Sequence, residues 1–286
     1  MRIGTLHEQE SCSRCMSEQV SLALHAAAQC LAKPLLERGI PQFIEYGISD
    51  ESLGRVQKEH ASAIEHFPGS ISPIKAMGAE SIHVVDDEAA FTRLVEEGSD
   101  VIYVAHSRDS DHEDAENGII VRIHDLMSID RSTPYGIMFH EWWQAARLGQ
   151  IPEFLVQGAY WCSIDDVAEG MLRIIKGVHA FSGSFDMCGR RYWTMEETWK
   201  EFEMLVARTV AGNDGNFRLS HLEADGGPAI HVEELSKQSK RTPRPSLEAL
   251  HETLLSVSNE GWNPRTPFRQ SLMLLVADLA HHYELN

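Results

Sequence analysis

The sequence predicts an α/β protein: a Rossmann-like, doubly wound parallel sheet with a smaller C-terminal α/β lobe. Three observations predict this class. Residues 20–47 read as a β-α-β unit, and short apolar runs alternate with amphipathic stretches through the first half of the chain. The chain has 286 residues, 43% of them apolar, which is enough to bury a core of this size. Strands that alternate with helices indicate a parallel sheet covered on both faces.

The β-α-β unit consists of an apolar run from Val20, an amphipathic run closed by Gly39, and a second apolar run to Gly47. In a dinucleotide-binding fold, the turn after the first strand approaches the pyrophosphate closely and therefore needs glycines. Here the three glycine positions carry Ala26, Gln29 and Ala32. A Cβ at the first turn makes positive φ costly, and the Gln29 side chain would crowd a pyrophosphate. The unit therefore predicts this architecture with an altered phosphate loop.

The middle of the chain continues the alternation and then shortens it. Residues 49–73 are polar and helical in pattern, with proline and glycine breaks at the end. We expect a strand at 81–85, a helix at 88–97, and strands at 100–105 and 119–123. The strand at 81–85 is then the third of the sheet, and the strand at 100–105 is the fourth. The acidic run 107–117 leaves no room for a further helix–strand–helix.

The second half is mostly helical. Helices are expected at 135–148, 165–176, 194–210, 247–257 and 267–283, and a strand at 183–188. Asp165 and Asp166 interact favourably with the helix dipole at the start of the helix 165–176. Thr194 is placed to cap the helix that runs to residue 210. We divide the chain into an N-terminal extension (1–19), a shortened Rossmann-like core (20–130) and C-terminal substrate-lobe elements (131–286) that interleave with the core.

Charge and cysteine content narrow the function classes. A net charge of −18 argues against nucleic-acid binding and against docking to anionic lipid. No apolar run is long enough to span a bilayer, and no apolar signal core is seen, so we expect a cytoplasmic protein. The odd count of five cysteines fits reduced thiols. Cys12 and Cys15 form a lone Cys-x-x-Cys without a second pair, so no metal site is predicted.

Four motifs follow one another in a recognisable order. They are Ile-Val-Arg at 120–122, Ser-Ile-Asp-Asp-Val-Ala-Glu-Gly at 163–170, Gly-Ser-Phe-Asp-Met at 183–187 with Tyr-Trp-Thr-Met-Glu-Glu at 192–197, and Gly-Trp-Asn-Pro-Arg-Thr-Pro-Phe at 261–268. In this order they resemble the extended short-chain dehydrogenase/reductase family of nucleotide-sugar epimerases, dehydratases and reductases. The resemblance covers most of residues 20–283. It implies a Rossmann fold, an NAD(P) cofactor and a nucleotide-sugar substrate.

The sequence departs from that family where the chemistry is done. None of the six tyrosines is followed by lysine four positions later, so the family's catalytic Tyr-x-x-x-Lys is absent. The segment that would carry it falls in the apparent deletion between Ser107 and Ile119. The arginine that grips a substrate phosphate in the family aligns with Ala159, and Asp186 stands where the family usually has asparagine. These departures predict a degenerate member without standard hydride chemistry, so we assign no cofactor and keep NAD(P) as the alternative.

Candidate site residues are of three kinds, and each has a structural alternative. Acid/base candidates lie near predicted strand ends: His106, His124 and Asp125. The family's cofactor positions are Ala26, Gln29, Ala32, Asp86 (the acid after the third strand) and Ser107. Substrate candidates are Arg122, Trp161 and Asp165. The alternatives are a strand-end cap for Asp86, an exposed residue for His106, an ion pair with Asp125 or Asp166 for Arg122, and core packing for the tryptophans.

Three functions stay open from the sequence. The first is a binding or accessory protein in a biosynthetic pathway, with a small polar ligand. The second is a repurposed isomerase or lyase that uses acid/base chemistry without nicotinamide. The third is an oxidoreductase with an altered NAD(P) loop. The terminal helix and the tryptophan-rich helix are each candidates for the face of a homodimer or for contact with a partner protein.

Overall fold

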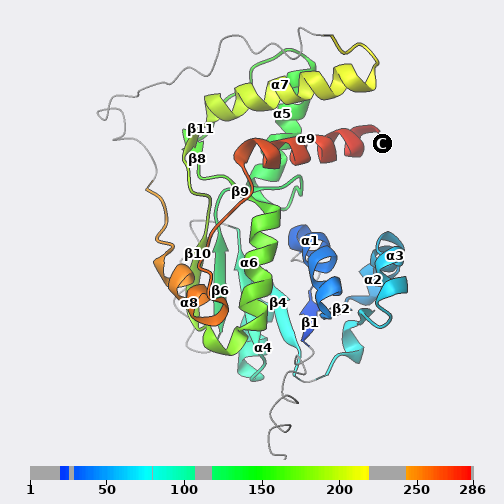
Figure 1. Ribbon diagram of the computed structural model, residues 1–286, viewed down its shortest axis with the longest axis vertical. Coiled ribbons are helices and arrows are strands. Elements are labelled where there is room, and N and C mark those ends of the chain that lie inside the picture. Colours follow the sequence, from blue (N-terminus) through cyan, green and yellow to red (C-terminus); the bar gives the residue numbers. More distant parts are fainter. Residues whose placement is uncertain (1–19, 26–28, 79, 107–117, 219–242, 285–286) are drawn as a thin grey trace, which may run out of the picture.

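A computed structural model describes residues 20–25, 29–78, 80–106, 118–218 and 243–284. Seven strands, all paired in parallel, form the main sheet in the order β10-β6-β5-β4-β1-β2-β3 (Figure 1). Their bounds are β1 Ser21–Leu24, β2 Glu45–Ile48, β3 Ile71–Pro73, β4 Ile82–Val85, β5 Val101–Ala105, β6 Ile119–Ile123 and β10 Gly183–Met187. This order confirms the predicted doubly wound parallel sheet.

The expected β-α-β unit is present around β1, α1 (Gln29–Gly39) and β2. β1 pairs with β2 in parallel, so that Leu22 lies opposite Tyr46. The Tyr46 hydroxyl donates to the backbone oxygen of Leu35 at 2.7 Å and ties the strand to the helix. A Cβ at Gly39 would lie 1.7 Å from the Tyr46 hydroxyl oxygen. The helix therefore ends on glycine because the tyrosine occupies the space of a side chain.

In the main sheet, the strand count differs from the prediction at β3. A short 3-10 turn, Ile40–Gln42, precedes β2, and the polar region after it forms α2 (Asp50–Glu59), α3 (Ala61–His66), β3 and a second 3-10 turn, Ile74–Ala76. Among the strands of the described residues, β3 pairs only with β2, and it includes Pro73, which an edge strand tolerates. The strand expected to be third is thus the fourth and lies directly beside β1. Three residues are too few for a periodic pattern, which is why the sequence did not reveal β3.

The two faces of the sheet are covered unequally. One face packs against α1, α2, α6 (Ile164–Lys176) and α8 (Glu248–Ser258) in a single large core. On the other face, α4 (Glu88–Glu96) places Phe91 and Leu94 against β4 and β5. Among the described residues, α4 supplies all the helical side chains of that smaller core.

A second layer lies beyond the carboxyl ends of the strands and forms the C-terminal lobe (Figure 1). It contains α5 (Pro134–Arg147), α7 (Met195–Asn213) and α9 (Phe268–Glu284). Below this layer, a 3-10 turn at Val178–Ala180 joins α6 to β10. Two small sheets link the layers: β8 (Gly158–Ala159) with β11 (Trp193–Thr194), and β7 (Leu126–Met127) with β9 (Cys162–Ser163). The lobe has its own aromatic core around Phe139, Trp142 and Phe202.

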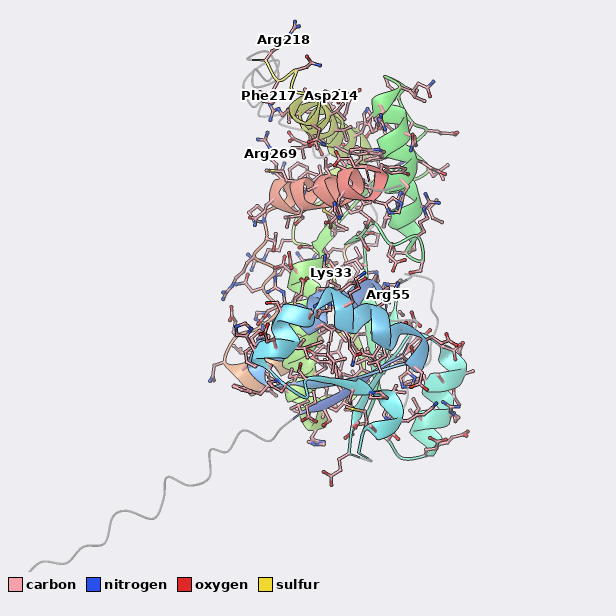
Figure 2. All side chains as sticks on the ribbon, turned by 90° about the vertical axis from the view of Figure 1, so that its right-hand side faces the viewer. Lys33, Arg55, Asp214, Phe217, Arg218 and Arg269 are labelled. Atoms are coloured by element: carbon pink, nitrogen blue, oxygen red, sulfur yellow. The ribbon has the colours of Figure 1, made fainter. Side chains whose placement is uncertain are left out.

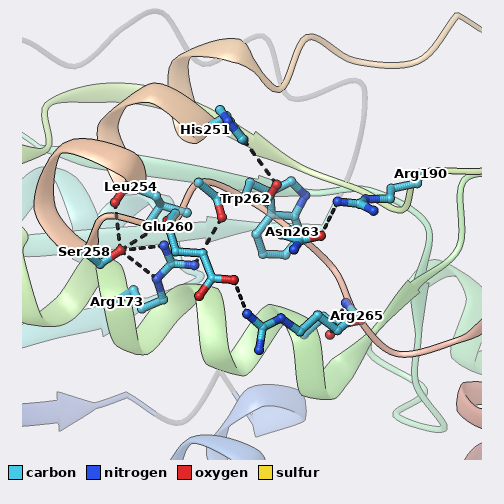
Figure 3. A network of polar contacts seen from close by, with 11 residues as sticks. Arg173, Arg190, His251, Leu254, Ser258, Glu260, Trp262, Asn263 and Arg265 are labelled. Atoms are coloured by element: carbon cyan, nitrogen blue, oxygen red, sulfur yellow. Dashed lines mark hydrogen bonds and ion pairs between the residues drawn. The ribbon is translucent and has the colours of Figure 1, made fainter.

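The segment between α8 and α9 is fastened along α6 (Figure 3). The Arg173 guanidinium donates to the Ser258 hydroxyl at 3.1 Å and to the Gly261 carbonyl at 3.4 Å. The Trp262 indole donates to the backbone oxygen of Cys188 at 3.1 Å. These bonds fix the segment that leads from α8 toward α9. None of the helices in the described parts of the chain has the length and apolar character that crossing a membrane requires.

Candidate functional site

Ionisable side chains gather where the central strands end. His25 follows β1, Asp86 follows β4, His106 follows β5 and His124 follows β6. The carboxyl ends of parallel strands meet at one edge of a sheet, and open α/β sheets bind ligands there. The lobe of α5, α7 and α9 lies over this edge. The site candidates are therefore found between the sheet and the lobe.

His106 contacts the start of the first helix. Its Nε2 lies 3.5 Å from the Sγ of Cys30, the second residue of α1. Burial, together with the nearby Asp130 and Asp86 carboxylates, raises the pKa of the Cys30 thiol to about 12. Burial lowers the pKa of His106. Both groups are therefore neutral at pH 7, so this pair is not an activated thiolate–imidazolium nucleophile.

Asp86 lies in the same region, after β4. Burial raises the pKa of its carboxyl to about 6. Its Oδ1 is buried and makes no hydrogen bond within the described part of the protein. A carboxyl held in this way favours its protonated form more than an exposed aspartate does.

His124 and Asp125 are neighbours in the chain but face different parts of the structure. His124 is 5% exposed and its Nε2 lies 2.6 Å from Oδ1 of Asp186 on β10. Asp125 has a φ of 52°, a left-handed conformation that aspartate tolerates better than most residues. Its carboxylate accepts hydrogen bonds from the Tyr135 hydroxyl at 3.0 Å and from the backbone N–H of Tyr160 at 2.7 Å. Asp125 thus ties the end of the sheet to the lobe.

A cavity of about 660 Å³, here called the central cavity, opens between the strand ends and α5. Two predicted residues, His106 and Asp125, line it. The other residues of its described lining are Pro134, Tyr135, Ile137, Met138, Glu141, Trp142, Pro152, Glu153, Phe154, Leu155, Val156, Gly158 and Met195. Volumes of this size are typical of small-molecule sites. Sequence reasoning did not single out Tyr135, Met138 and Glu141 of α5, although these residues recur at the three-residue spacing of one helix face.

The three substrate candidates lie outside the central cavity. Arg122 donates to the Ser184 hydroxyl on β10 at 3.1 Å. Trp161 is buried in the core of the lobe and its indole donates to the Thr198 hydroxyl at 2.9 Å. Asp165 pairs with Arg38 of α1, with 2.7 Å between Oδ1 and Nη2. All three have structural partners, and they are not brought together.

The predicted cofactor positions lie partly beyond what the structure describes. Ala26 and Ser107 fall outside the described residues, and Gln29 is the first residue of α1. Ala32 lines a smaller cavity of about 270 Å³ beside α1 and α2, together with Lys33 and Arg55. Figure 2 shows these two cationic side chains on the same side of the molecule. Lys33 and Arg55 come from different helices, α1 and α2, and meet in the lining of this cavity.

Comparison with known proteins shows where the fold occurs. No protein-family model and no curated protein sequence matches the chain. Solved structures do match it along most of their length. One is a dTDP-glucose 4,6-dehydratase from Bacillus anthracis in complex with NAD, with 12% identity over 93% of this chain and 97% of that one and a TM-score of 0.54. The chain has the extended short-chain dehydrogenase fold.

Two further structures support this fold. The terminal R domain of the myxalamid PKS-NRPS biosynthetic pathway has 12% identity, covers 92% of this chain and 91% of its own, and gives a TM-score of 0.55. UDP-glucose 4-epimerase from Thermotoga maritima, solved with UDP-glucose, has 11% identity, covers 93% of this chain and 100% of its own, and gives a TM-score of 0.50. The extended short-chain dehydrogenase fold predicted from the four motifs is thus present.

Proposed function

We propose that this chain is a small-molecule-binding protein that keeps the extended short-chain dehydrogenase fold without the hydride chemistry, acting as a binding or accessory protein in a biosynthetic pathway. The observation that carries the proposal is at the central cavity. Its described lining contains one tyrosine, Tyr135, which donates to the Asp125 carboxylate, and contains no lysine. The sequence nowhere offers the Tyr-x-x-x-Lys pair. A reductase would lack a positioned proton donor that usually contributes about 10²–10⁴-fold in rate.

The start of α1 also supports loss of the dinucleotide. In this fold the pyrophosphate sits at the N-terminal end of the first helix. The Cys30 thiol there contacts His106, and the Asp86 and Asp130 carboxylates are close enough to raise its pKa. A pyrophosphate beside two carboxylates would meet like-charge repulsion in a poorly solvated place. The altered loop and the acidic surroundings therefore both disfavour binding of a dinucleotide.

The substrate side offers no phosphate grip at the family's position. Ala159, which aligns with the phosphate-binding arginine, is 0% exposed on β8 and pairs with Trp193. A cytoplasmic, reducing location is part of the proposal and agrees with the free, buried thiols of Cys30, Cys162 and Cys188.

The acid/base alternative has less support from the geometry. His124 turns toward Asp186 on β10 and is not part of the described lining of the central cavity. His106 does line the cavity, but burial lowers its pKa and its Nε2 contacts a thiol. We therefore rank an isomerase or lyase function second. An oxidoreductase with an altered loop ranks third.

Titration with NAD, NADH, NADP and NADPH, read by calorimetry and by native mass spectrometry of the purified protein, tests the proposal. We expect no dinucleotide binding at cofactor concentrations that saturate ordinary dehydrogenases. Native mass spectrometry also tells whether the protein carries another small molecule when purified. Tight binding of a dinucleotide together with turnover of a nucleotide sugar contradicts the proposal.

A further inference from the structure

The central cavity has an acidic lining. Asp125 lines it as a buried side chain, and Glu141 of α5 and Glu153 line it as exposed side chains. None of the residues in the described lining is lysine or arginine. His106 is the remaining ionisable side chain apart from Tyr135, and burial favours its neutral form by lowering its pKa. The described lining thus carries negative charge with no lysine or arginine to offset it.

The rest of the lining is apolar and partly open to solvent. Trp142 and Phe154 meet edge to face, with ring centroids 5.8 Å apart. Ile137, Leu155 and Val156 expose 51%, 90% and 45% of their surfaces at the same cavity. Solvent-exposed apolar groups gathered at one opening are typical of a ligand or partner contact. Phe154 is partly exposed in the lining that also carries the carboxylates, and both an aromatic ring and a carboxylate attract a cation.

We infer that the central cavity binds a small cationic molecule with an apolar or aromatic body, that is, an amine of the arylalkyl type. The amine would be attracted by the carboxylates of Glu141, Glu153 and Asp125, and the body would lie on the partly exposed side chains of Phe154 and Met138. A nucleoside diphosphate does not fit this lining, because its charges would face carboxylates only. The inference rests on the proposed function and gives its ligand a chemical class.

The test uses three probes of different charge: tryptamine and indole-3-propionate, which share an indole ring, and UDP. Binding to the full chain is measured by calorimetry at pH 7 and low salt. We expect tryptamine to bind at least tenfold more tightly than indole-3-propionate, and its affinity to fall as salt is added. Equal or tighter binding of either anion, or no binding of tryptamine, overturns the inference.

Two variants locate the site. Glu141→Gln with Glu153→Gln removes two exposed charges and should weaken tryptamine about fivefold, as expected for exposed charge pairs. Glu65→Gln with Glu252→Gln changes the net charge equally on exposed helices away from the cavity and should leave the affinity unchanged. Equal effects of the two double variants would place the attraction in the overall charge and contradict the assigned site.

A third variant reverses the preference. Val156→Arg adds a cation at the cavity opening, where the side chain is already half-exposed and the fold has room for it. It should weaken tryptamine at least tenfold and strengthen indole-3-propionate. No change in either probe contradicts the inference. These measurements are independent of the dinucleotide titration. The proposed ligand class can therefore be contradicted while the proposed loss of hydride chemistry stands, and the reverse.

Discussion

Thr266 holds the carboxylate of Asp166 with two donors: its backbone N–H lies 3.1 Å from Oδ2 and its hydroxyl 3.0 Å from Oδ1. The backbone N–H of Arg265 adds a third contact, 3.0 Å from Oδ1. Asp166 is in the first turn of α6, and Thr266 leads into α9. One carboxylate therefore joins the sheet-covering helix to the last helix of the lobe.

Replacing Asp166 by alanine should lower the free energy of unfolding by about 2 kcal/mol, because hydrogen bonds to a charged group contribute roughly 1.5–3 kcal/mol. Chemical denaturation followed by tryptophan fluorescence measures the change. Asp50→Ala is the control, since Asp50 makes an exposed ion pair with Lys75 at 2.5 Å and such pairs contribute about 1 kcal/mol or less. A smaller loss for Asp166→Ala than for Asp50→Ala contradicts the role given to this carboxylate.

The same contact explains what the sequence could predict. The Asp165-Asp166 pair and the Gly-Trp-Asn-Pro-Arg-Thr segment from Gly261 were singled out separately, nearly 100 positions apart, and Asp166 bonds to Thr266 in the structure. Their residue types are specific because each performs a task few others can: a carboxylate accepts several N–H donors, and Gly261 leaves room for the His251 ring. Such positions are readable from one sequence.

The central cavity was not readable in this way. Its lining comes from the end of β5, the end of β6, α5, residues 152–158 and the start of α7. Met138 or Phe154 is an ordinary apolar residue until the fold places it in the same lining as His106 and Asp125. His106 and Asp125 could be proposed because a polar residue directly after a buried strand is conspicuous. The edge strand β3 escaped for a related reason, since three residues carry no periodicity.

Gly170 on α6 should not tolerate a side chain. A Cβ there would lie 2.6 Å from Cζ3 of Trp262 and 3.1 Å from Cε of Met187. Gly170→Ala should therefore destabilise the protein by about 1–3 kcal/mol, as overpacking does. Gly54→Ala on α2 is the matched control, because nothing lies within 4 Å of its Cβ position, and it should stabilise by roughly 0.5–1 kcal/mol. Thermal unfolding of the two variants should shift in opposite directions; a shared direction contradicts the packing.

The described cysteines should be unreactive in the folded protein. Cys30, Cys162 and Cys188 are buried, and burial raises the pKa of the Cys30 and Cys162 thiols. The thiolate is the reactive form. Burial therefore slows the reaction with a reagent in two ways, because it blocks access and because a raised pKa leaves less thiolate. In a Cys12→Ser/Cys15→Ser variant, an aromatic disulfide reagent at pH 8 should react slowly without denaturant and rapidly with three thiols in urea. Fast reaction of the folded variant contradicts the burial.

Asp86 should make the protein less stable as the pH rises. Burial raises the pKa of its carboxyl from 3.8 to about 6. Between these values the folded protein binds more protons than the unfolded chain, so the free energy of unfolding falls as the pH increases through this window. Above pH 6 the folded state carries a half-buried charge whose cost, screened by water, is of the order of 1 kcal/mol.

Asp86→Asn removes this cost, because an amide does not ionise. The variant should therefore be more stable than the parent at pH 8, by roughly 1 kcal/mol, and the difference should shrink as the pH is lowered from 6 toward 4. Denaturant midpoints of the two proteins at pH 8, 6 and 4.5 measure the trend. At each pH the other ionisable groups are the same in both proteins, so the difference reports on Asp86. A variant that is less stable than the parent at pH 8, or a difference that grows at low pH, would mean that the ionised carboxylate is stabilised in the folded protein, and the buried Oδ1 would then need a donor.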